Sequence, residues 1–231
     1  QGIARLGVLP LVFIAWVILS RVLDLDVIYA ARAAWLSAVP ILIIIIYGPL
    51  FLPYPREMRW RVFILHWFCF APFWILLWEL TPIVNRSMFE GVEYTQANLP
   101  YYIWWLGYLS SDLDYGARTP FFVLAELTWW VITIPIAAAV VQLWRGREVH
   151  AFIIFGLSGA LQFYNVCYFI GYGGIVEHFG NIASDSILAP LLYWILNGLW
   201  GVAGGIASVL SFLYLFRIYL NRPENARGSV S

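Results

Sequence analysis

The sequence contains no lysine and few charged residues of any kind. Charged side chains make up 11% of the 231 residues, whereas an ordinary soluble domain has about 25%. All thirteen basic residues are arginine, thirteen acidic residues balance them, and no basic block is present. Without a basic block the chain has no positively charged surface to bind phosphate groups. This composition excludes a nucleic-acid-binding protein, a soluble globular enzyme and a disordered chain.

Cysteine and metal-ligand patterns are also scarce. The two cysteines, Cys69 and Cys167, lie inside apolar runs, which favours small apolar side chains over a disulfide framework. His66, His150 and His178 are too far apart in the sequence to form a metal-binding motif. No glycine-rich phosphate loop or nucleophile motif occurs. We therefore expect neither a metal ion nor a cofactor.

Long apolar runs dominate the chain. Hydrophobic residues make up 62% of it and the mean hydropathy is +0.80. The runs are unbroken, unlike the alternating pattern of a membrane β-barrel, and a membrane helix needs about 20 apolar residues. The sequence predicts an all-α, polytopic membrane helix bundle with about six transmembrane helices, in a single domain over residues 1–231. The candidate spans are residues 7–22, 34–52, 62–84, 120–144, 151–171 and 188–219.

Arginine is distributed unevenly between the two sides that six spans define. Nine arginines fall on one side and four on the other, and the positive-inside tendency places the richer side and both termini in the cytosol. The connection 85–119 then lies on the lumenal or outer side. Its tyrosines and tryptophans are typical of a segment at the membrane interface, and Asn85-Arg86-Ser87 is a glycosylation sequon. The arginine-rich side comprises Arg5, Arg56, Arg59, Arg61, Arg145, Arg147, Arg217, Arg222 and Arg227.

A few acidic and amide side chains lie inside the candidate spans, where such groups are costly and usually functional. Those of interest are Glu79, Glu126, Gln162, Asn165 and Asn197. Counted inward at about 1.5 Å per residue, all but Gln162 lie roughly 8–14 Å from one membrane surface. Helices that run in opposite directions thus bring these groups to nearly one depth. Alternatives stay open: Glu79 can face the headgroups or pair with Arg86, and Glu126 can make a purely structural hydrogen bond. Asn197 and Gln162 can make interhelical hydrogen bonds, and for Gln162 alone this interpretation is favoured.

Aromatic residues flank these polar positions. Desolvation penalises a charged carboxylate and so favours a protonated carboxyl, which can act as a general acid. Aromatic faces stabilise a cation that develops nearby, although single tryptophans more often serve packing. Together these groups can protonate an alkene or epoxide, hold a carbocation and remove a proton elsewhere. The flanking residues include Trp78, Trp129, Tyr164, Tyr168 and Trp200.

Several sequence patches resemble the EXPERA superfamily, which includes sterol isomerases of the emopamil-binding type and the sigma-2 receptor. The patches are Asp112-Leu113-Asp114-Tyr115, Glu126, Gln162-Phe163-Tyr164-Asn165 and Asn197-Gly198-Leu199-Trp200. The resemblance covers residues 61–219 and leaves residues 1–60 as additional N-terminal helices. It implies that Glu79 and Glu126 form an acid–base pair, that Asn197 orients a carboxyl and that Trp200 faces the cation. It also implies a location in the endoplasmic reticulum membrane. The substrate-binding candidates are Trp78, Asp112, Tyr115, Trp129, Gln162, Tyr164, Asn165 and Tyr168.

The sequence departs from the sterol isomerases at Ile75, where they carry a histidine one turn before the first glutamate. The Trp78-Glu79 pair also resembles the small membrane-bound terpene cyclases of meroterpenoid pathways. We therefore expect an isomerase or cyclase that acts, without redox change, on a sterol or terpenoid substrate arriving from the lipid bilayer. The alternative is a non-catalytic sterol- or lipid-binding membrane protein of the sigma-2 receptor type. Small residues in the last span permit a homodimer without requiring one.

Overall fold

The computed structural model describes residues 8–220, and 82% of these residues are helical. Among them there is no β-strand, and extended backbone pairs only in an isolated bridge between Asp112 and Ile182. The predicted all-α class is therefore confirmed. The first residue of the candidate span 7–22 lies outside the described residues, as do three arginines of the arginine-rich side: Arg5, Arg222 and Arg227.

Within the described residues, five helices are long and apolar enough to cross a membrane. The predicted span at 7–22 corresponds to α2 (Val8–Leu23), whose 16 residues fall short of the number that a full crossing needs. The structure thus supports an integral membrane protein with five crossing helices, and the count of six is not confirmed. The five are α3 (Val27–Tyr47) with a 3-10 turn (Gly48–Phe51), α4 (Arg56–Trp74) continuing through a π-helical turn, η2 (Ile75–Glu79), into α5 (Leu80–Val84), α8 (Pro120–Trp144), α9 (Glu148–Ile175) and α10 (Leu188–Leu220).

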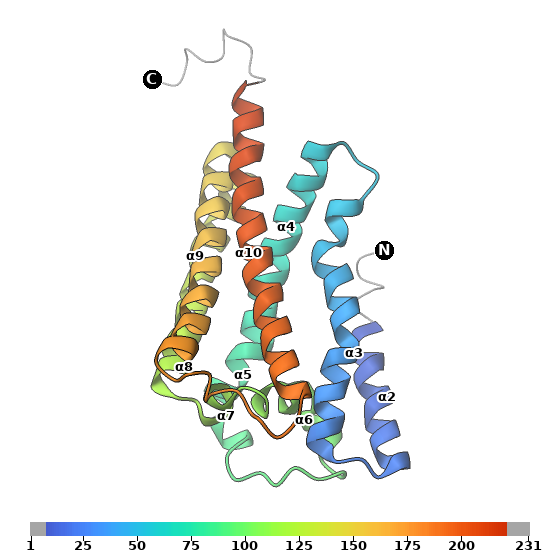
Figure 1. The fold of residues 1–231 in the computed structure, drawn as a ribbon. Helices are drawn as coiled ribbons and strands as arrows, with labels where there is room; N and C mark the ends of the chain where they lie inside the picture. Colours follow the sequence, from blue (N-terminus) through green and yellow to red (C-terminus); the bar gives the residue numbers. More distant parts are fainter. Residues whose placement is uncertain (1–7, 221–231) are drawn as a thin grey trace.

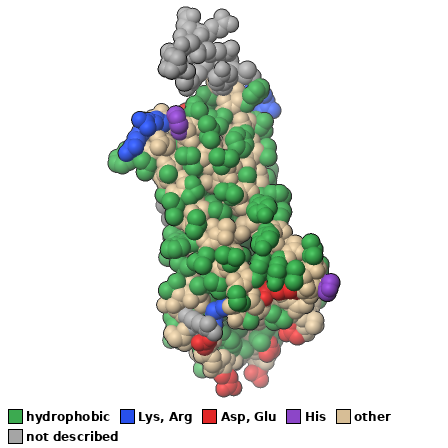
Figure 2. Space-filling model, turned by 90° about the vertical axis from the view of Figure 1, so that its left-hand side faces the viewer, with side chains coloured by type: hydrophobic (Ala, Val, Ile, Leu, Met, Phe, Trp, Pro, Cys, Tyr) green, Lys and Arg blue, Asp and Glu red, His purple; other side chains and the backbone are tan. Residues whose placement is uncertain are grey.

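Charged side chains lie mainly at the two ends of the bundle. Acidic side chains gather at the end where the short helices α6 (Leu99–Leu109) and α7 (Leu113–Ala117) lie, and arginine side chains project at the opposite end (Figures 1 and 2). On the face that Figure 2 shows, the side chains between the two ends are hydrophobic or uncharged. Cys69 and Cys167 are free and exposed. An apolar belt between two charged ends is the surface expected of a protein that lies across a bilayer.

The helices form two groups, and α10 joins them (Figure 1). α10 packs against α9 on one side and against α3 and α4 on the other. α8 packs mainly on α9, while α2 and α6 cover α3. Contacts between α8 and the α4 segment are few and include those with η2. The two groups therefore meet around η2, and the polar residues of the spans lie at this level.

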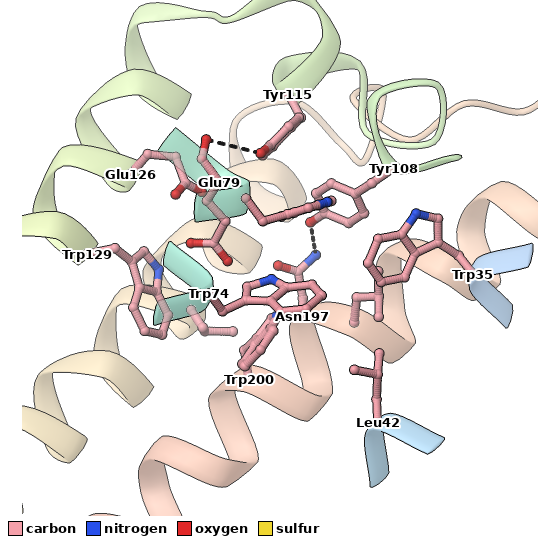
Figure 3. A pocket seen from close by; sticks show the side chains of 13 residues that line it. Trp35, Leu42, Trp74, Glu79, Tyr108, Tyr115, Glu126, Trp129, Asn197 and Trp200 are labelled. Carbon is pink, nitrogen blue, oxygen red and sulfur yellow. Dashed lines mark hydrogen bonds between the residues drawn. The ribbon is translucent and has the colours of Figure 1, made fainter. Parts of the chain in front are cut away.

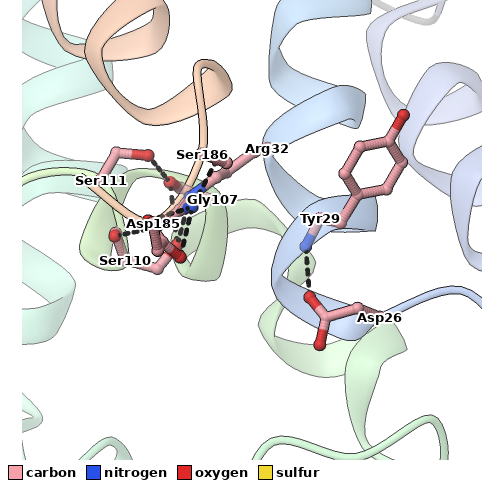
Figure 4. A network of polar contacts seen from close by, with 8 residues as sticks. All are labelled: Asp26, Tyr29, Arg32, Gly107, Ser110, Ser111, Asp185 and Ser186. Atoms are coloured by element: carbon pink, nitrogen blue, oxygen red, sulfur yellow. Dashed lines mark hydrogen bonds and ion pairs between the residues drawn. The ribbon is translucent and has the colours of Figure 1, made fainter. Parts of the chain in front are cut away.

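Arg32 of α3 ties the connection between α9 and α10 to the bundle (Figure 4). Its buried guanidinium donates hydrogen bonds to both carboxylate oxygens of Asp185 at 2.8 and 2.9 Å, and to Ser186 Oγ at 2.9 Å. It also donates to the hydroxyl and the carbonyl of Ser110, just after α6. A buried charge is costly unless it is paired. These contacts therefore hold α3, the end of α6 and the α9–α10 connection in one arrangement.

Close backbone contact between α9 and α10 depends on glycine. A Cβ added at Gly159 would lie 2.7 Å from the Gly204 carbonyl oxygen and 2.8 Å from the Ser208 nitrogen. Both are backbone atoms of α10, so the helix itself would have to move. Gly171 lies on the same helix α9, and a Cβ there would meet nothing within 4 Å.

We expect Gly159→Ala to destabilise the fold by about 1–3 kcal/mol, because overpacking forces α9 and α10 apart. Gly171→Ala is the matched control and should stabilise the protein by roughly 0.5–1 kcal/mol, since alanine costs less entropy than glycine in a helix. Thermal unfolding in detergent micelles compares the two variants. A Gly159→Ala variant that unfolds at or above the wild-type temperature would contradict the close contact.

Candidate active site

A cavity lies where the two helix groups meet around η2. Its volume is about 40 Å³. Seven residues of its lining are site residues that the sequence predicts: Trp78, Glu79, Tyr115, Glu126, Trp129, Asn197 and Trp200. The other lining residues are Trp35, Leu42, Trp74, Tyr108, Val166 and Leu196. Figure 3 shows that carboxyl, hydroxyl and indole groups converge on this space.

Glu79 and Glu126 meet at the cavity wall (Figure 3), and their carboxyl groups are within hydrogen-bond reach of each other. The Oε2 atom of each is buried and has no hydrogen-bond partner among the described residues. An ionised carboxylate can only accept hydrogen bonds, so a hydrogen bond between the two groups requires a proton on one of them. Two carboxylates that share a site also disfavour simultaneous ionisation. The two carboxyl groups are therefore suited to share a single proton.

A π-helical turn positions Glu79 within its membrane helix. In η2 the N–H of Leu80 bonds to the carbonyl of Ile75, five residues earlier, and such turns often occur at functional sites. Proline follows shortly: Pro82 has no N–H, so the Trp78 carbonyl, four residues earlier, has no ordinary helical donor. The sequence Trp78-Glu79-Leu80-Thr81-Pro82 thus builds an irregular helix segment in which the Trp78 carbonyl needs another partner.

Side chains from the α6–α7 segment bond to two carbonyl groups here, and one of them is the Trp78 carbonyl that lacks a helical donor. The Trp105 Nε1–H donates to the Trp78 carbonyl at 3.1 Å. The Tyr115 hydroxyl donates to the Glu79 carbonyl at 3.3 Å (Figure 3). The predicted interfacial segment is therefore part of the site, because its side chains hold the backbone on which Glu79 is mounted.

Four indoles form an aromatic wall of the cavity: Trp35, Trp74, Trp78 and Trp200. Neighbouring ring centroids are 5.3 to 6.0 Å apart. The N–H groups of Trp35 and Trp78 both donate to the Trp104 carbonyl, at 3.1 and 2.8 Å. These contacts fix the two rings, and the negative faces of indoles attract cations. The wall therefore suits a ligand that is apolar and becomes positively charged.

Asn197 lines the cavity and is linked to Tyr108. Its Nδ2 donates to the Tyr108 hydroxyl at 3.0 Å and to the Tyr193 carbonyl at 2.9 Å (Figure 3). The sequence predicts that Asn197 orients a carboxyl, whereas the hydrogen bonds among described residues direct it to Tyr108. The Tyr108 hydroxyl accepts this bond and keeps its own proton free to donate.

Two amide residues that the sequence predicts as substrate-binding lie outside the lining. Asn165 faces an adjoining cavity of about 30 Å³ that Glu126 also lines. Gln162 is fully buried, and its Oε1 accepts a hydrogen bond from Trp67 Nε1–H at 2.8 Å. Gln162 thus makes the interhelical hydrogen bond that was the alternative for this residue.

Three further predicted binding residues also lie away from the cavity. Tyr164 and Tyr168 are 65% and 47% exposed on α9. They lie four residues apart on one helix face, while Asn165 and Val166 face inward. Asp112 is fully buried beside the site rather than on its wall.

Three aromatic lining residues were not predicted from the sequence: Trp74, Tyr108 and Trp35. Trp74 lies one turn before Trp78, a spacing that places both on one helix face. Tyr108 lies in the segment predicted to be interfacial. Trp35 belongs to residues 1–60, which the sequence interpretation treated as additional to the functional core, and only the packing of α3 brings it to the cavity.

Asp112 caps α7 and has an unusual environment. One of its oxygens, Oδ1, accepts a hydrogen bond from the Tyr115 N–H at 3.1 Å. Its Oδ2 has no hydrogen-bond partner among the described residues. Burial, together with the nearby charges of Asp114 and Glu177, raises the pKa of Asp112 to about 7, although the Tyr115 N–H opposes this shift.

No family model, curated protein or solved structure matches this chain. Its chemistry must therefore be inferred from the geometry of the site. The fold and the site define an integral-membrane helix bundle with two carboxyl groups within hydrogen-bond reach of each other in an aromatic cavity.

We expect Trp105→Phe to destabilise the protein by about 1–3 kcal/mol, because it leaves the buried Trp78 carbonyl without a donor. Trp104→Phe is the control, since Trp104 contributes its carbonyl to the hydrogen bonds described above. Thermal unfolding should separate the two variants. An equal loss of stability in both would contradict the role of the Trp105 N–H.

The pKa of Asp112 predicts a pH-dependent stability. An unfolded aspartate has a pKa of about 3.9, so between about pH 4 and pH 7 the folded protein retains a proton that the unfolded chain has released. The wild type should therefore lose stability relative to Asp112→Asn as pH rises through this window, and the difference should become constant above it. Asparagine keeps the capping acceptor. Unfolding of both proteins from pH 4 to pH 8 measures the difference, and a constant difference would contradict the raised pKa.

Proposed function

We propose that the protein is an integral-membrane acid–base enzyme that protonates a hydrophobic isoprenoid, a sterol or a terpenoid, and resolves the carbocation by deprotonation. The observation that carries this proposal is that the carboxyl groups of Glu79 and Glu126 lie within hydrogen-bond reach of each other in an aromatic cavity. A carboxylic acid of this kind is a general acid, and the carboxylate left behind is a general base. The reaction is an isomerisation or a cyclisation without redox change.

The reaction begins when the acid of the pair transfers its proton to the substrate. At an alkene, the π electrons form the new C–H bond; at an epoxide, the oxygen takes the proton and its C–O bond breaks. Positive charge develops on carbon, and the electrons of the broken O–H bond stay on the carboxylate. The cation moves or closes a ring and then loses a proton to a carboxylate. Substrate and product therefore have the same composition.

The aromatic wall stabilises the intermediate cation. A cation within about 6 Å of an indole face gains about 0.5–2 kcal/mol, the larger value where water is excluded. Trp74 and Trp78 precede Glu79 in the same helical segment, so they present their rings next to the proton donor. Trp200, one turn after Asn197 on α10, adds a third ring beside Trp74.

The membrane setting fits an apolar substrate and product, which can reach the cavity from the bilayer. The resemblance to the EXPERA superfamily supports the same chemistry, since its sterol isomerases use membrane carboxylates to relocate a double bond through a carbocation. We also propose the endoplasmic reticulum membrane as the location, with the arginine-rich end and both termini in the cytosol.

Substitution of either carboxyl tests the proposal. Purified wild type and variants are incubated with a panel of sterols and epoxidised prenyl compounds, and products of unchanged mass are resolved by chromatography and mass spectrometry. We expect Glu126→Gln and Glu79→Gln each to lower turnover by about 100- to 10,000-fold, the contribution typical of a general acid or base. Glutamine keeps the size of the side chain and a hydrogen-bond donor for the partner carboxyl.

Glu57→Gln is the matched control, because Glu57 lies in the first turn of the same membrane helix, at its far end from Glu79. It should leave turnover unchanged. Full activity in a folded Glu126→Gln variant would refute the acid–base role. A wild type that binds panel compounds tightly and converts none of them would favour the alternative, a sterol- or lipid-binding protein.

A further inference from the structure

Buried polar side chains concentrate beside α7, next to the cavity of the carboxyl pair. The fold brings two segments together there. The Leu113 N–H donates to the Asn181 carbonyl at 2.7 Å, and the Ala183 N–H donates to the Ser111 carbonyl at 3.0 Å. Four side chains around this contact are each at most 6% exposed: Asp112, Asp114, Asn181 and Tyr193. Asn181 is within hydrogen-bond reach of Tyr193. Asp112 Oδ2 has no hydrogen-bond partner among the described residues.

Such a cluster requires an explanation, because buried polar groups are nearly always hydrogen-bonded. Ordered water commonly supplies the partner where several polar groups converge. A metal ion is the other candidate, but in the part of the chain that the structure describes no three His, Cys, Asp or Glu side chains are placed to share one. The mixture of carboxyl, amide and phenol groups offers both donors and acceptors, which suits water and mobile protons.

The cluster reaches the surface at Glu177, just after the end of α9. Glu177 is partly exposed, and its carboxyl is within hydrogen-bond reach of Asp114. Asp114 in turn interacts electrostatically with Asp112. A hydrogen bond between two carboxyls again requires a proton. Glu177 and Asp114 therefore form a second site that can hold a proton, at the charged end of the bundle.

Tyr108 connects this cluster to the carboxyl pair. The Asp112 N–H donates to the Tyr108 backbone carbonyl at 2.9 Å, which places the two residues side by side. Tyr108 lines the main cavity and also the adjoining cavity beside Glu126. Because the hydroxyl accepts from Asn197 and keeps its own proton free, it can donate a proton on one side while it receives one on the other.

We propose that these groups form a proton route between the aqueous surface beside α7 and the Glu79–Glu126 pair. From the surface inward, the route comprises Glu177, Asp114, Asp112 and Tyr108. It rests on the proposed function, in which each turnover takes one proton from the acid and returns one to the base. A proton from water enters at Glu177 and passes along O–H groups and bridging water to the ionised carboxyl of the pair. The reverse movement releases the returned proton to water, so one turnover consumes no net protons.

Proton exchange at the pair can be measured without substrate. Protein in lipid nanodiscs is transferred from ordinary to heavy water, and infrared spectra are recorded over time, because the C=O stretch of a protonated carboxyl shifts on deuteration. Loss of a band in Glu126→Gln identifies the pair. We expect Asp112→Asn to slow exchange of this band at least about tenfold, because asparagine keeps the capping acceptor but carries no acidic proton. Tyr108→Phe should slow it as well, since it removes the hydroxyl and keeps the ring.

Asp26→Asn is the matched control. Asp26 caps α3 in the same way, with Oδ1 accepting from the Tyr29 N–H at 2.8 Å (Figure 4), and it is exposed. Its variant should exchange at the wild-type rate. Wild-type exchange in both Asp112→Asn and Tyr108→Phe would overturn the route and leave the proposed function standing. Absence of the pair's band from the wild type would overturn the shared proton itself, and both proposals with it.

Discussion

The close approach of two carboxyl groups inside a membrane bundle is the constraint on which the rest of this structure depends. A hydrogen bond between Glu79 and Glu126 exists only while one of them holds a proton, and a second charge in apolar surroundings would be costly. The groups around the pair serve this arrangement. Indoles form the cavity wall beside it, and the backbone carbonyls of Trp78 and Glu79 are paired with side chains.

The pair can form because the helix that carries Glu79 is irregular where it meets α8. Pro82 deprives the Trp78 carbonyl of its helical donor, and the Trp105 N–H bonds to this carbonyl; the Tyr115 hydroxyl donates to the neighbouring Glu79 carbonyl. The α6–α7 segment must therefore be held firmly against the bundle. Arg32 contributes to this, because it joins α3, the end of α6 and the α9–α10 connection in one buried network.

Much of the fold could be predicted from the sequence, because apolar runs long enough to cross a bilayer are a strong signal. The predicted spans at 62–84, 120–144, 151–171 and 188–219 each lie on a long helix. The span predicted at 34–52 starts too late: α3 begins at Val27, and Arg32 lies within it. Hydropathy treats an arginine as a boundary, whereas Asp185, far away in the sequence, makes its burial possible.

Site residues were predicted where a polar side chain lies inside a membrane helix, because its burial is energetically costly. They were missed where their position at the cavity depends on the packing of helices distant in the sequence. Glu79, Glu126 and Asn197 stood out because polar groups inside membrane helices are expensive. Tyr164 and Tyr168 flank Asn165 in the sequence, but the helical repeat turns them to the opposite face. Trp35 could not be assigned, because its place on the cavity wall follows from the packing of α3 against α6 and α10.

Isotope incorporation tests the central claim most directly. The wild-type protein is incubated in heavy water with the panel of sterols and epoxidised prenyl compounds, and each product is analysed by mass spectrometry. If the pair in exchange with water supplies the initiating proton, the product is an isomer of the substrate that carries a newly incorporated deuterium, and Glu126→Gln does not form it. An isomer without deuterium, or panel compounds recovered unchanged, would contradict proton-initiated catalysis by this site.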